Sequence, residues 1–553
     1  MIIPSFFLWQ MILSSFEQHI SEIMPFRQEN AKQIKIKTKR SGTLYSIVST
    51  AILHGIDGIL VKVEADVSAG MPLFEMVGFL SSEVREAKER VRTALKNEGY
   101  QLPAKRITVN LSPAGLRKSG SGFDLPIAVA VMAALGIIEA ERTKDILVIG
   151  EIGLDGTVQP VQGIFPITLE AEKQGFLKCM VPDKNATEAG MVRGIEIIPV
   201  QSLEEVIAYF KNGEKRQISP VEYKERSTKS DLPDFSEMRG QPFLKRACEV
   251  AVAGMHNLLM IGPPGAGKTM AAKRIPSILP PMSEEEQMEL AKIYSICGMW
   301  NEKEPVLMER PFRSPHHTIT PQGLAGGGRT PKPGEISLAH HGVLFLDELT
   351  EFRKETLEIL RQPLEEHSVH LVRASGTYHY PADFILVAAM NPCSCGNFPD
   401  RQKCRCSMSE IRRYLSRISQ PLLNRIDLCV EVPRLSFEEV AEPKKEETSE
   451  IIRKRILTVH ELQKERFKKF TFSYNSQMPV ELTEEYCMLD HKKKAYMKQI
   501  YTSFQLNARA YYKILKVART IADLDGSKEV EFRHLNEAVC YRTIDKKFWE
   551  QTA

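Results

Sequence analysis

A glycine-rich loop at residues 257–269, NLLMIGPPGAGKT, constrains this chain more than any other feature. The run LLMI is short and apolar, as in a buried parallel strand. The loop that follows has the complete P-loop spacing, in which glycines let backbone amides surround phosphates. Lys268 would reach the outer phosphates, and the Thr269 hydroxyl would ligate magnesium. The expected ATP-binding residues are Gly262, Pro263, Pro264, Gly265, Ala266, Gly267, Lys268, Thr269 and Met270.

Two further apolar runs end in polar residues. VLFLDE ends in Asp347 and Glu348, at the carboxyl end of a strand where open α/β sheets bind ligands. Asp347 would hold Mg²⁺, and Glu348 would orient or deprotonate the attacking water. FILVAAMN ends in Asn391, which either positions the same water or forms the turn before Pro392. This pattern predicts hydrolysis as well as binding of ATP.

The length of 553 residues is too great for one hydrophobic core and indicates three or four domains, at about 150 residues each. Alternating β-rich and helical patterns predict an α/β multidomain protein with a helical C-terminal part. The expected units are an extension of unknown role at 1–40, an α/β domain at 41–216, a polar linker at 217–233, the P-loop domain at 234–435 and a helical domain at 436–553. The net charge of +4 is nearly balanced and indicates no particular partner.

The apolar stretch IIPSFFLWQMIL near the start lacks the basic segment and the cleavage site of a signal peptide. It is also shorter than the roughly 20 apolar residues of a membrane-spanning helix. An upstream translation start, with Met24 as an internal alternative, would explain it. The ten cysteines of this long chain do not resemble a small disulfide scaffold. We therefore expect a cytoplasmic protein without a membrane partner.

Four cysteines form the pattern C-x-C-x(8)-C-x-C: Cys393, Cys395, Cys404 and Cys406. Four thiolates suit tetrahedral Zn²⁺, although the spacing is tighter than in common zinc knuckles. Unliganded thiols and a redox pair are the alternatives. If zinc is bound, all four coordination positions are filled, and the site is structural rather than catalytic.

These features together resemble AAA+ ATPases, and most closely the ComM/YifB family of magnesium-chelatase-like ATPases. The resemblance covers residues 44–544 and is carried by GQPFLKRACEVAVAGMHNLLMIGPPGAGKT, RPFRSPHHTIT, PGEISLAHHGVLFLDE, NPCSCG, LSRISQPLLNRIDL and NARAYYKILKVARTIADL. It implies a Lon-protease-like N-terminal domain, an AAA+ ATPase domain and a helical lid. It also implies that residues 238–241, with Gln241, lie near the adenine, and that residues 312–328 project into a central pore.

The same resemblance assigns two arginines. Arg425 in LLNRID is similar to an arginine finger, which reaches the γ-phosphate of the neighbouring subunit. Arg509 in NARAYY is similar to the second sensor arginine, which couples the nucleotide state to the lid. A finger that acts between subunits requires a closed ring, by analogy a homo-hexamer.

The stretches GSGFDLPIAVAVMAAL and VIGEIGLDGTVQPVQGI resemble the proteolytic domain of Lon. Asp124 stands where Lon has its serine, and the FPI at 165–167 stands where the lysine is expected, so we expect no peptidase activity. The loop at 112–122, with Arg117 and Lys118, could instead contact a nucleic-acid backbone.

The resemblance implies an ATP-driven ring motor on single-stranded or branched DNA, namely a branch-migration helicase in recombination or in uptake of transforming DNA. Its DNA contacts would come from Arg313, His316 and His317 in the insertion, and from Arg373 on a hairpin between 370 and 380. The alternatives are a chelatase-type motor for metal insertion and a protein-remodelling ATPase.

Overall fold

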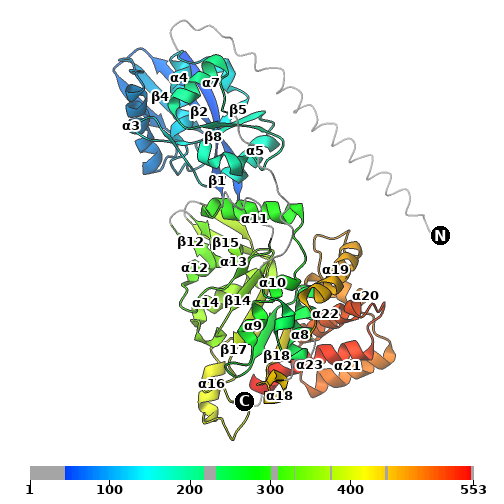
Figure 1. Cartoon of the computed structure of the whole chain (residues 1–553). Coiled ribbons are helices and arrows are strands. Elements are labelled where there is room, and N and C mark those ends of the chain that lie inside the picture. Colours follow the sequence, from blue (N-terminus) through cyan, green and yellow to red (C-terminus); the bar gives the residue numbers. More distant parts are fainter. Residues whose placement is uncertain are drawn as a thin grey trace, which may run out of the picture.

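The computed structural model describes residues 44–216, 232–300, 309–328, 331–373, 376–441 and 446–549. The expected extension at 1–40 and residues 217–231 of the expected linker lie outside these ranges. Figure 1 shows an N-terminal α/β domain, a central α/β domain and a group of C-terminal helices beside the central domain. The α/β class with a helical C-terminal region, predicted from the sequence, is confirmed.

The N-terminal domain is built on a seven-stranded mixed sheet in the order β3-β4-β2-β1-β5-β8-β9. Its strands are β1 (Leu44–His54), β2 (Asp57–Ser68), β3 (Leu73–Val77), β4 (Arg106–Ser112), β5 (Ile146–Val148), β8 (Lys178–Pro182) and β9 (Glu196–Val200), and a small ladder joins β6 (Glu151–Ile152) to β7 (Val158–Gln159). The helices are α3 (Ser82–Asn97), α4 (Asp124–Ala134), α5 (Ile164–Lys173), α6 (Ala186–Ala189) and α7 (Leu203–Asn212). Residues of α3, α4 and α7 share one core, whereas α5 belongs to another, so the sheet is covered on both faces.

The central domain has a five-stranded parallel sheet in the order β11-β14-β17-β10-β18. The strands are β10 (Leu258–Ile261), β11 (Phe312–Arg313), β14 (Val343–Leu346), β17 (Ile385–Met390) and β18 (Leu428–Glu431). Every residue of β10, β14 and β17 is buried, as expected for central parallel strands with both faces covered. Because neighbouring strands run in the same direction, the residues that follow β10, β14 and β17 meet at one edge of the sheet.

Helices and one hairpin surround this sheet. The helices are α8 (Pro242–Gly254), α9 (Lys268–Ala272), α10 (Ile275–Ile278), α11 (Glu284–Cys297), α12 (Pro321–Ala325), α13 (Glu335–Leu338), α14 (Lys354–Glu358), α15 (Pro363–Glu366), α16 (Met408–Leu415) and α17 (Gln420–Leu423). The expected hairpin is formed by β15 (Ser368–Arg373) and β16 (Gly376–Pro381), and β12 (Gly326–Gly327) pairs with β13 (Lys332–Pro333).

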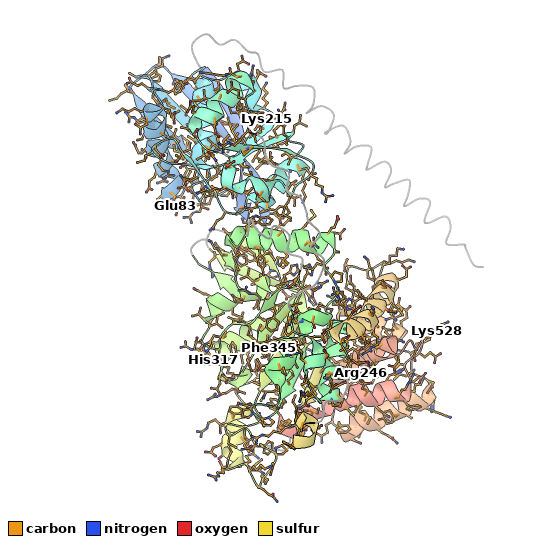
Figure 2. The ribbon with its side chains drawn as sticks, in the orientation of Figure 1. Glu83, Lys215, Arg246, His317, Phe345 and Lys528 are labelled. Carbon is orange, nitrogen blue, oxygen red and sulfur yellow. The ribbon has the colours of Figure 1, made fainter. Side chains whose placement is uncertain are left out.

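The C-terminal helices after residue 446 share a buried core with α8 rather than forming a separate one. The helices of this region are α18 (Phe437–Ala441), α19 (Ser449–Arg466), α20 (Val480–Tyr486), α21 (His491–Ser503), α22 (Ala508–Leu524) and α23 (Phe532–Trp549). Apolar residues of α8, α19 and α22 belong to one continuous buried cluster. Arg246 on α8 lies at this boundary (Figure 2) and forms ion pairs with Glu537 at 3.0 Å and Asp525 at 3.3 Å.

Helix α11 joins the N-terminal domain to the central one, between which it lies in Figure 1. Lys292 pairs with Asp57 at 2.8 Å, and the Ser295 hydroxyl donates to the buried Glu188. The hairpin makes a second contact, because the rings of His54 and Tyr378 lie 4.8 Å apart. Among the residues that the structure describes, no helix is both long and apolar enough to cross a membrane.

Candidate ATPase site

The loop between β10 and α9 adopts a conformation that requires its glycines. Gly265 and Gly267 have φ angles of 77° and 95°, in the left-handed region. Gly262 is required by space, because a Cβ there would lie 2.2 Å from the carbonyl oxygen of Val432. The loop opens into a cleft of about 370 Å³, lined by Pro264, Gly265, Ala266, Gly267, Lys268, Thr269, Met270, Asp347, Glu348, Met390 and Asn391. The three strand ends are therefore brought together as the sequence predicts.

Lys268 lies at the centre of this cleft. Its ammonium group donates to the carbonyl oxygens of Gly262 at 2.6 Å and Pro263 at 2.9 Å, and to Oδ1 of Asn391 at 3.2 Å. Burial lowers the pKa of Lys268 to about 8, and the nearby Asp347 carboxylate only partly offsets this effect. The site thus holds a cation with neutral oxygen partners that phosphate oxygens can replace.

The expected magnesium ligands touch each other. The Thr269 hydroxyl donates to Oδ2 of Asp347 at 2.7 Å, and Oδ1 of Asp347 accepts the Glu348 amide at 2.9 Å. A hydroxyl beside a carboxylate is the hard oxygen set that Mg²⁺ prefers, so these residues fit the ion. Glu348 has φ +50°, which is uncommon for a non-glycine residue, and its side chain is 59% exposed. Glu348 lines the cleft beside Asp347.

His317, expected in the pore insertion, lies beside the catalytic candidate Glu348. Its Nδ1 is 3.5 Å from Oε2 of Glu348, and its ring meets the edge of Phe352. Figure 2 shows His317 on the central domain. His317 therefore contacts a residue of the cleft, and its expected contact with DNA stays a prediction, as does that of the neighbouring, exposed His316.

Arg425 and Arg509 lie outside the lining of this cleft and converge on Glu365 of α15. Arg425, only 9% exposed, approaches Oε2 of Glu365 at 2.7 Å and donates to the carbonyl oxygens of Arg361 and Pro421. Arg509, 62% exposed, approaches Oε1 of the same carboxylate at 3.5 Å. The two arginines therefore share one carboxylate, although only Arg509 is largely exposed. No sequence pattern marks Glu365, whose role depends on tertiary contacts.

Gln241 is not among the residues that line the cleft. Its side chain contacts the loop between β10 and α9 instead. Its side-chain amide donates to the carbonyl oxygens of Pro433 at 2.7 Å and Ala266 at 3.4 Å, and the residue is 5% exposed. Its side chain thus supports the loop, and the expected position of residues 238–241 near the adenine stays a prediction.

Two other expected nucleic-acid contacts have intramolecular partners. Arg313 forms a paired contact with Glu335 at 2.7 and 2.8 Å. Lys118 is fully buried and donates to the carbonyl oxygen of Pro113, so it cannot reach a phosphate backbone. Arg117 lies over the ring of Phe79, at 6.0 Å. By contrast, Arg373 is exposed at the end of β15, beside Gly327 of the insertion.

Asp124, at the position of the Lon serine, is a buried partner of Arg90. Both carboxylate oxygens contact the guanidinium, at 2.7 and 2.8 Å, and Oδ2 also accepts the Ile152 amide at 3.3 Å. Burial raises the pKa of Asp124, and the hydrogen bonds from Arg90 oppose that rise. This arrangement is structural, and the absence of peptidase activity stays a prediction.

The four cysteines of the C-x-C-x(8)-C-x-C pattern lie close together. The sulfur atoms of Cys393, Cys395, Cys404 and Cys406 are all within 4.8 Å of one another. Burial raises the pKa of the Cys395 thiol, but hydrogen bonds from the Asn397 amide and from Cys393 outweigh this effect and lower it to about 6. Burial instead raises the pKa of the Cys393 and Cys404 thiols. It is the convergence of four sulfurs, the ligand set of structural zinc sites, that suits Zn²⁺.

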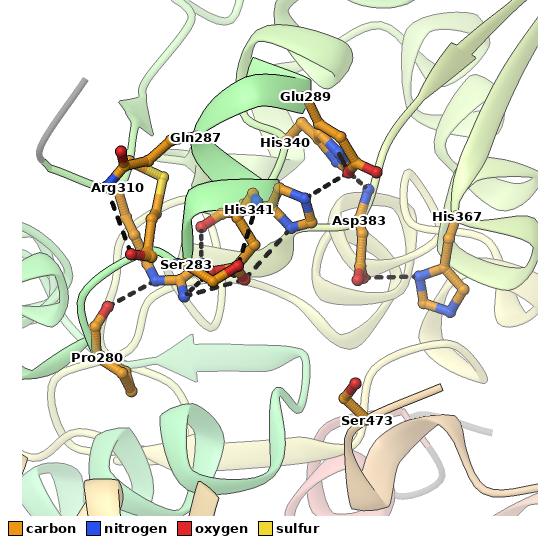
Figure 3. Close-up of polar contacts among 12 residues, drawn as sticks. Pro280, Ser283, Gln287, Glu289, Arg310, His340, His341, His367, Asp383 and Ser473 are labelled. Atoms are coloured by element: carbon orange, nitrogen blue, oxygen red, sulfur yellow. Dashed lines mark hydrogen bonds and ion pairs between the residues drawn. The ribbon is translucent and has the colours of Figure 1, made fainter. Parts of the chain in front are cut away.

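A second group of polar side chains joins Glu289 of α11 to His340 and His341, which precede β14, and to Asp383 (Figure 3). The sequence did not reveal these residues as a group. The Nε2 atoms of His340 and His341 lie 3.1 and 2.8 Å from Oε2 of Glu289, and these hydrogen bonds hold the pKa of Glu289 well below its usual range. Nδ1 of His340 accepts the Asp383 amide at 3.0 Å, so the proton of the neutral ring lies on Nε2 and points at Glu289. This tautomer favours a hydrogen-bonded link between α11 and β14 over a metal site. The adjacent histidines were its only signal in the sequence.

Comparison with known families agrees with this geometry. The family described as magnesium chelatase, subunit ChlI, matches residues 234–440, its C-terminal part matches 446–542, and a further model for subunit ChlI of Mg-chelatase matches 63–185. The chain is 41% identical to the competence protein ComM of Haemophilus influenzae over 510 residues, 90% of this chain and 97% of that protein. It is 39% identical to the uncharacterized protein YifB of Escherichia coli over 505 residues, 91% of this chain and 97% of that protein.

A more limited similarity relates the N-terminal part to Lon. Lon protease 2 of Bacillus subtilis is 28% identical over 179 residues, 29% of this chain and 32% of that protein. The P-loop cleft, the parallel sheet order and the near full-length relatives all agree with the resemblance in the sequence. The chain belongs to the ComM/YifB family of magnesium-chelatase-like AAA+ ATPases.

Proposed function

We propose that this chain is the subunit of a cytoplasmic homo-hexameric ring that hydrolyses ATP to move DNA, as a branch-migration helicase. The observation that carries the motor proposal is the separation of the catalytic groups. Lys268, Asp347 and Glu348 line the cleft, whereas Arg425 and Arg509 lie together on Glu365, outside that lining. A neighbouring copy could supply both arginines to the cleft, which requires a ring with repeated head-to-tail contacts.

Within the cleft, Lys268 would exchange its carbonyl partners for β- and γ-phosphate oxygens. Bound Mg²⁺ would neutralise phosphate charge, held by Thr269 and Asp347. Glu348 would accept a proton from the attacking water, and Asn391, already within 3.2 Å of Lys268, would orient it. Arg425 from the adjoining copy would stabilise the charge that develops on the γ-phosphate.

Two observations favour DNA as the substrate. The 41% identical relative is named a competence protein, and it matches 90% of this chain. In addition, the exposed Arg373 at the end of the hairpin lies beside Gly327, so the two segments expected at the pore adjoin each other. A cation beside exposed loops suits a nucleic-acid backbone.

The test compares stimulation of ATP hydrolysis by single-stranded, forked and duplex DNA and by an unfolded protein. We expect forked or single-stranded DNA to stimulate most, in a salt-sensitive manner, and Lys268→Ala to abolish all turnover. Arg373→Ala should reduce stimulation by DNA but not the basal rate. Stimulation by unfolded protein alone would favour a remodelling ATPase, and indifference to every DNA would refute the proposal.

We also propose that the cysteines 393, 395, 404 and 406 bind one structural Zn²⁺, since four convergent thiols leave no open coordination position. Metal analysis of the purified protein tests this directly.

A further inference from the structure

The four-cysteine cluster has the dimensions of a metal site. The sulfur atoms of Cys393 and Cys395 lie 3.4 Å apart, those of Cys393 and Cys404 lie 3.8 Å apart, and those of Cys395 and Cys404 lie 3.6 Å apart. A tetrahedron with Zn–S bonds of about 2.3 Å has edges of about 3.8 Å. A disulfide would require about 2.05 Å. The cluster therefore matches a tetrahedral metal rather than a disulfide pair.

The loop that carries these thiols begins at the hydrolysis site. Asn391, which contacts Lys268, is the first residue after β17, and Cys393 follows two residues later. The loop also touches the phosphate-binding loop directly. Gly396, at φ +76°, lies so close to Pro264 that an added Cβ would be 2.5 Å from the Cδ atom of that proline. The cluster thus adjoins the cleft on two sides.

Packing and hydrogen bonds also hold the loop, since Arg434 donates to Oδ1 of Asn397 at 3.3 Å and Arg401 lies over the Phe398 ring at 5.0 Å. Between the end of β17 at Met390 and the start of α16 at Met408, the structure contains neither helix nor strand. Phe398 anchors the loop through its ring against Phe548, and its amide donates to Cys393 Sγ at 3.4 Å. A segment of this length without helix or strand is costly to order, and four metal–sulfur bonds would add a strong further constraint.

We propose that a metal ion on Cys393, Cys395, Cys404 and Cys406 fixes Asn391 against Lys268, so that metal loading sets the rate of ATP hydrolysis. This inference rests on the proposed ATPase function. In this proposal the cysteines act only indirectly. They hold Asn391 in position, and they hold Gly396 against Pro264. The phosphate contacts of Lys268 and Thr269 come from α9, which has its own packing against the core. Loss of metal should therefore lower kcat more than it raises KM.

The experiment uses the full chain and the variants Cys395→Ser and Cys406→Ser, whose cysteines are less buried than Cys393 and Cys404. Cys540→Ser on α23 is the matched control, since it removes an exposed thiol outside the cluster. We measure zinc per chain by elemental analysis, affinity for a fluorescent ATP analogue, kcat and KM. Wild type and control should carry about one zinc each. Both cluster variants should lose zinc and show kcat about 10–100-fold lower, with little change in nucleotide affinity.

Chelation of wild-type protein followed by readdition of Zn²⁺ provides a second readout that needs no substitution. Hydrogen exchange of residues 391–407 should rise on chelation and fall on readdition, in parallel with kcat. Wild type that hydrolyses ATP without bound metal, or a zinc-free variant with wild-type kcat, would overturn the inference. Zinc-loaded wild type that binds but never hydrolyses ATP would instead refute the proposed function.

Discussion

At the scale of single residues, binding of ATP should change both the hydrogen-bond partners and the pKa of Lys268. The partners of Lys268 are two carbonyl oxygens and one amide oxygen, and burial lowers its pKa to about 8. Triphosphate oxygens carry negative charge and would raise that pKa again. The charge state of Lys268 should therefore be coupled to ATP binding.

This coupling predicts proton uptake. At pH 8.5 much of the Lys268 population is neutral, so binding of Mg-ATP should draw protons from solution, whereas near pH 7 most of the lysine is already charged and should take up far fewer. Calorimetric titrations in two buffers of different ionisation enthalpy measure this number. Lys268→Arg is the control, because arginine stays charged throughout this range. Equal proton uptake by wild type and Lys268→Arg would contradict the assignment.

Glu348→Gln gives a second residue-scale prediction. The amide keeps the size of the side chain but cannot accept a proton, so kcat should fall by about 10²–10⁴-fold. Affinity for ATP should be retained, because the phosphate contacts would come from Lys268 and the loop amides. Single-turnover hydrolysis and equilibrium binding separate the two effects. An equal loss of binding would show that Glu348 has a structural role.

The residues of the cleft could be predicted because they follow parallel strands, whose ends meet wherever the strands lie in one sheet. Glu365 could not, since its meaning depends on the approach of two distant arginines. For Arg313 and Lys118 the sequence suggested a role, and tertiary contacts argue against it. Their positive charges suggested DNA contacts, but Glu335 and a backbone carbonyl already satisfy them.

At the scale of elements, α11 is the connection between the two α/β domains. It carries a buried contact, Ser295 with Glu188, and a more exposed one, Lys292 with Asp57. Glu188 also accepts the Phe165 amide at 3.2 Å, and burial raises its pKa despite these hydrogen bonds. The alternation of strands and helices predicted both domains. It could not predict this interface, which depends on a few side chains far apart in the sequence.

The two contacts should differ in strength. Ser295→Ala leaves a buried carboxylate without one donor and should cost about 1–3 kcal/mol of unfolding free energy. Lys292→Ala removes an ion pair whose Asp57 is 61% exposed and should cost less than about 1 kcal/mol. Urea unfolding of both variants measures the difference. Equal costs would contradict the assignment of Glu188–Ser295 as the stronger contact.

At the scale of the whole molecule, each proposed active site needs two chains. A mixture of inactive variants tests this arrangement. Arg425→Ala should lose about 10³-fold or more in kcat, because it lacks the finger, and Lys268→Ala should be inactive because it lacks the phosphate lysine.

Mixing the two variants should restore part of the ATPase activity, since some interfaces then combine an intact cleft with an intact Arg425. Mixing Lys268→Ala with a Lys268→Ala, Arg425→Ala double variant is the control and should restore none. Failure of the first mixture, with mixed assemblies demonstrated by mass photometry, would place Arg425 in its own chain's site.

The shared carboxylate of Glu365 would link assembly to nucleotide binding. In a single chain its one negative charge is divided between Arg425 and Arg509. In the proposed ring, a phosphate of the adjoining chain would compete with Glu365 for these cations. By thermodynamic reciprocity, the factor by which ATP strengthens association between chains equals the factor by which association strengthens ATP binding. Glu365 would then set the protein concentration at which rings form, although it contacts neither the substrate nor the pore.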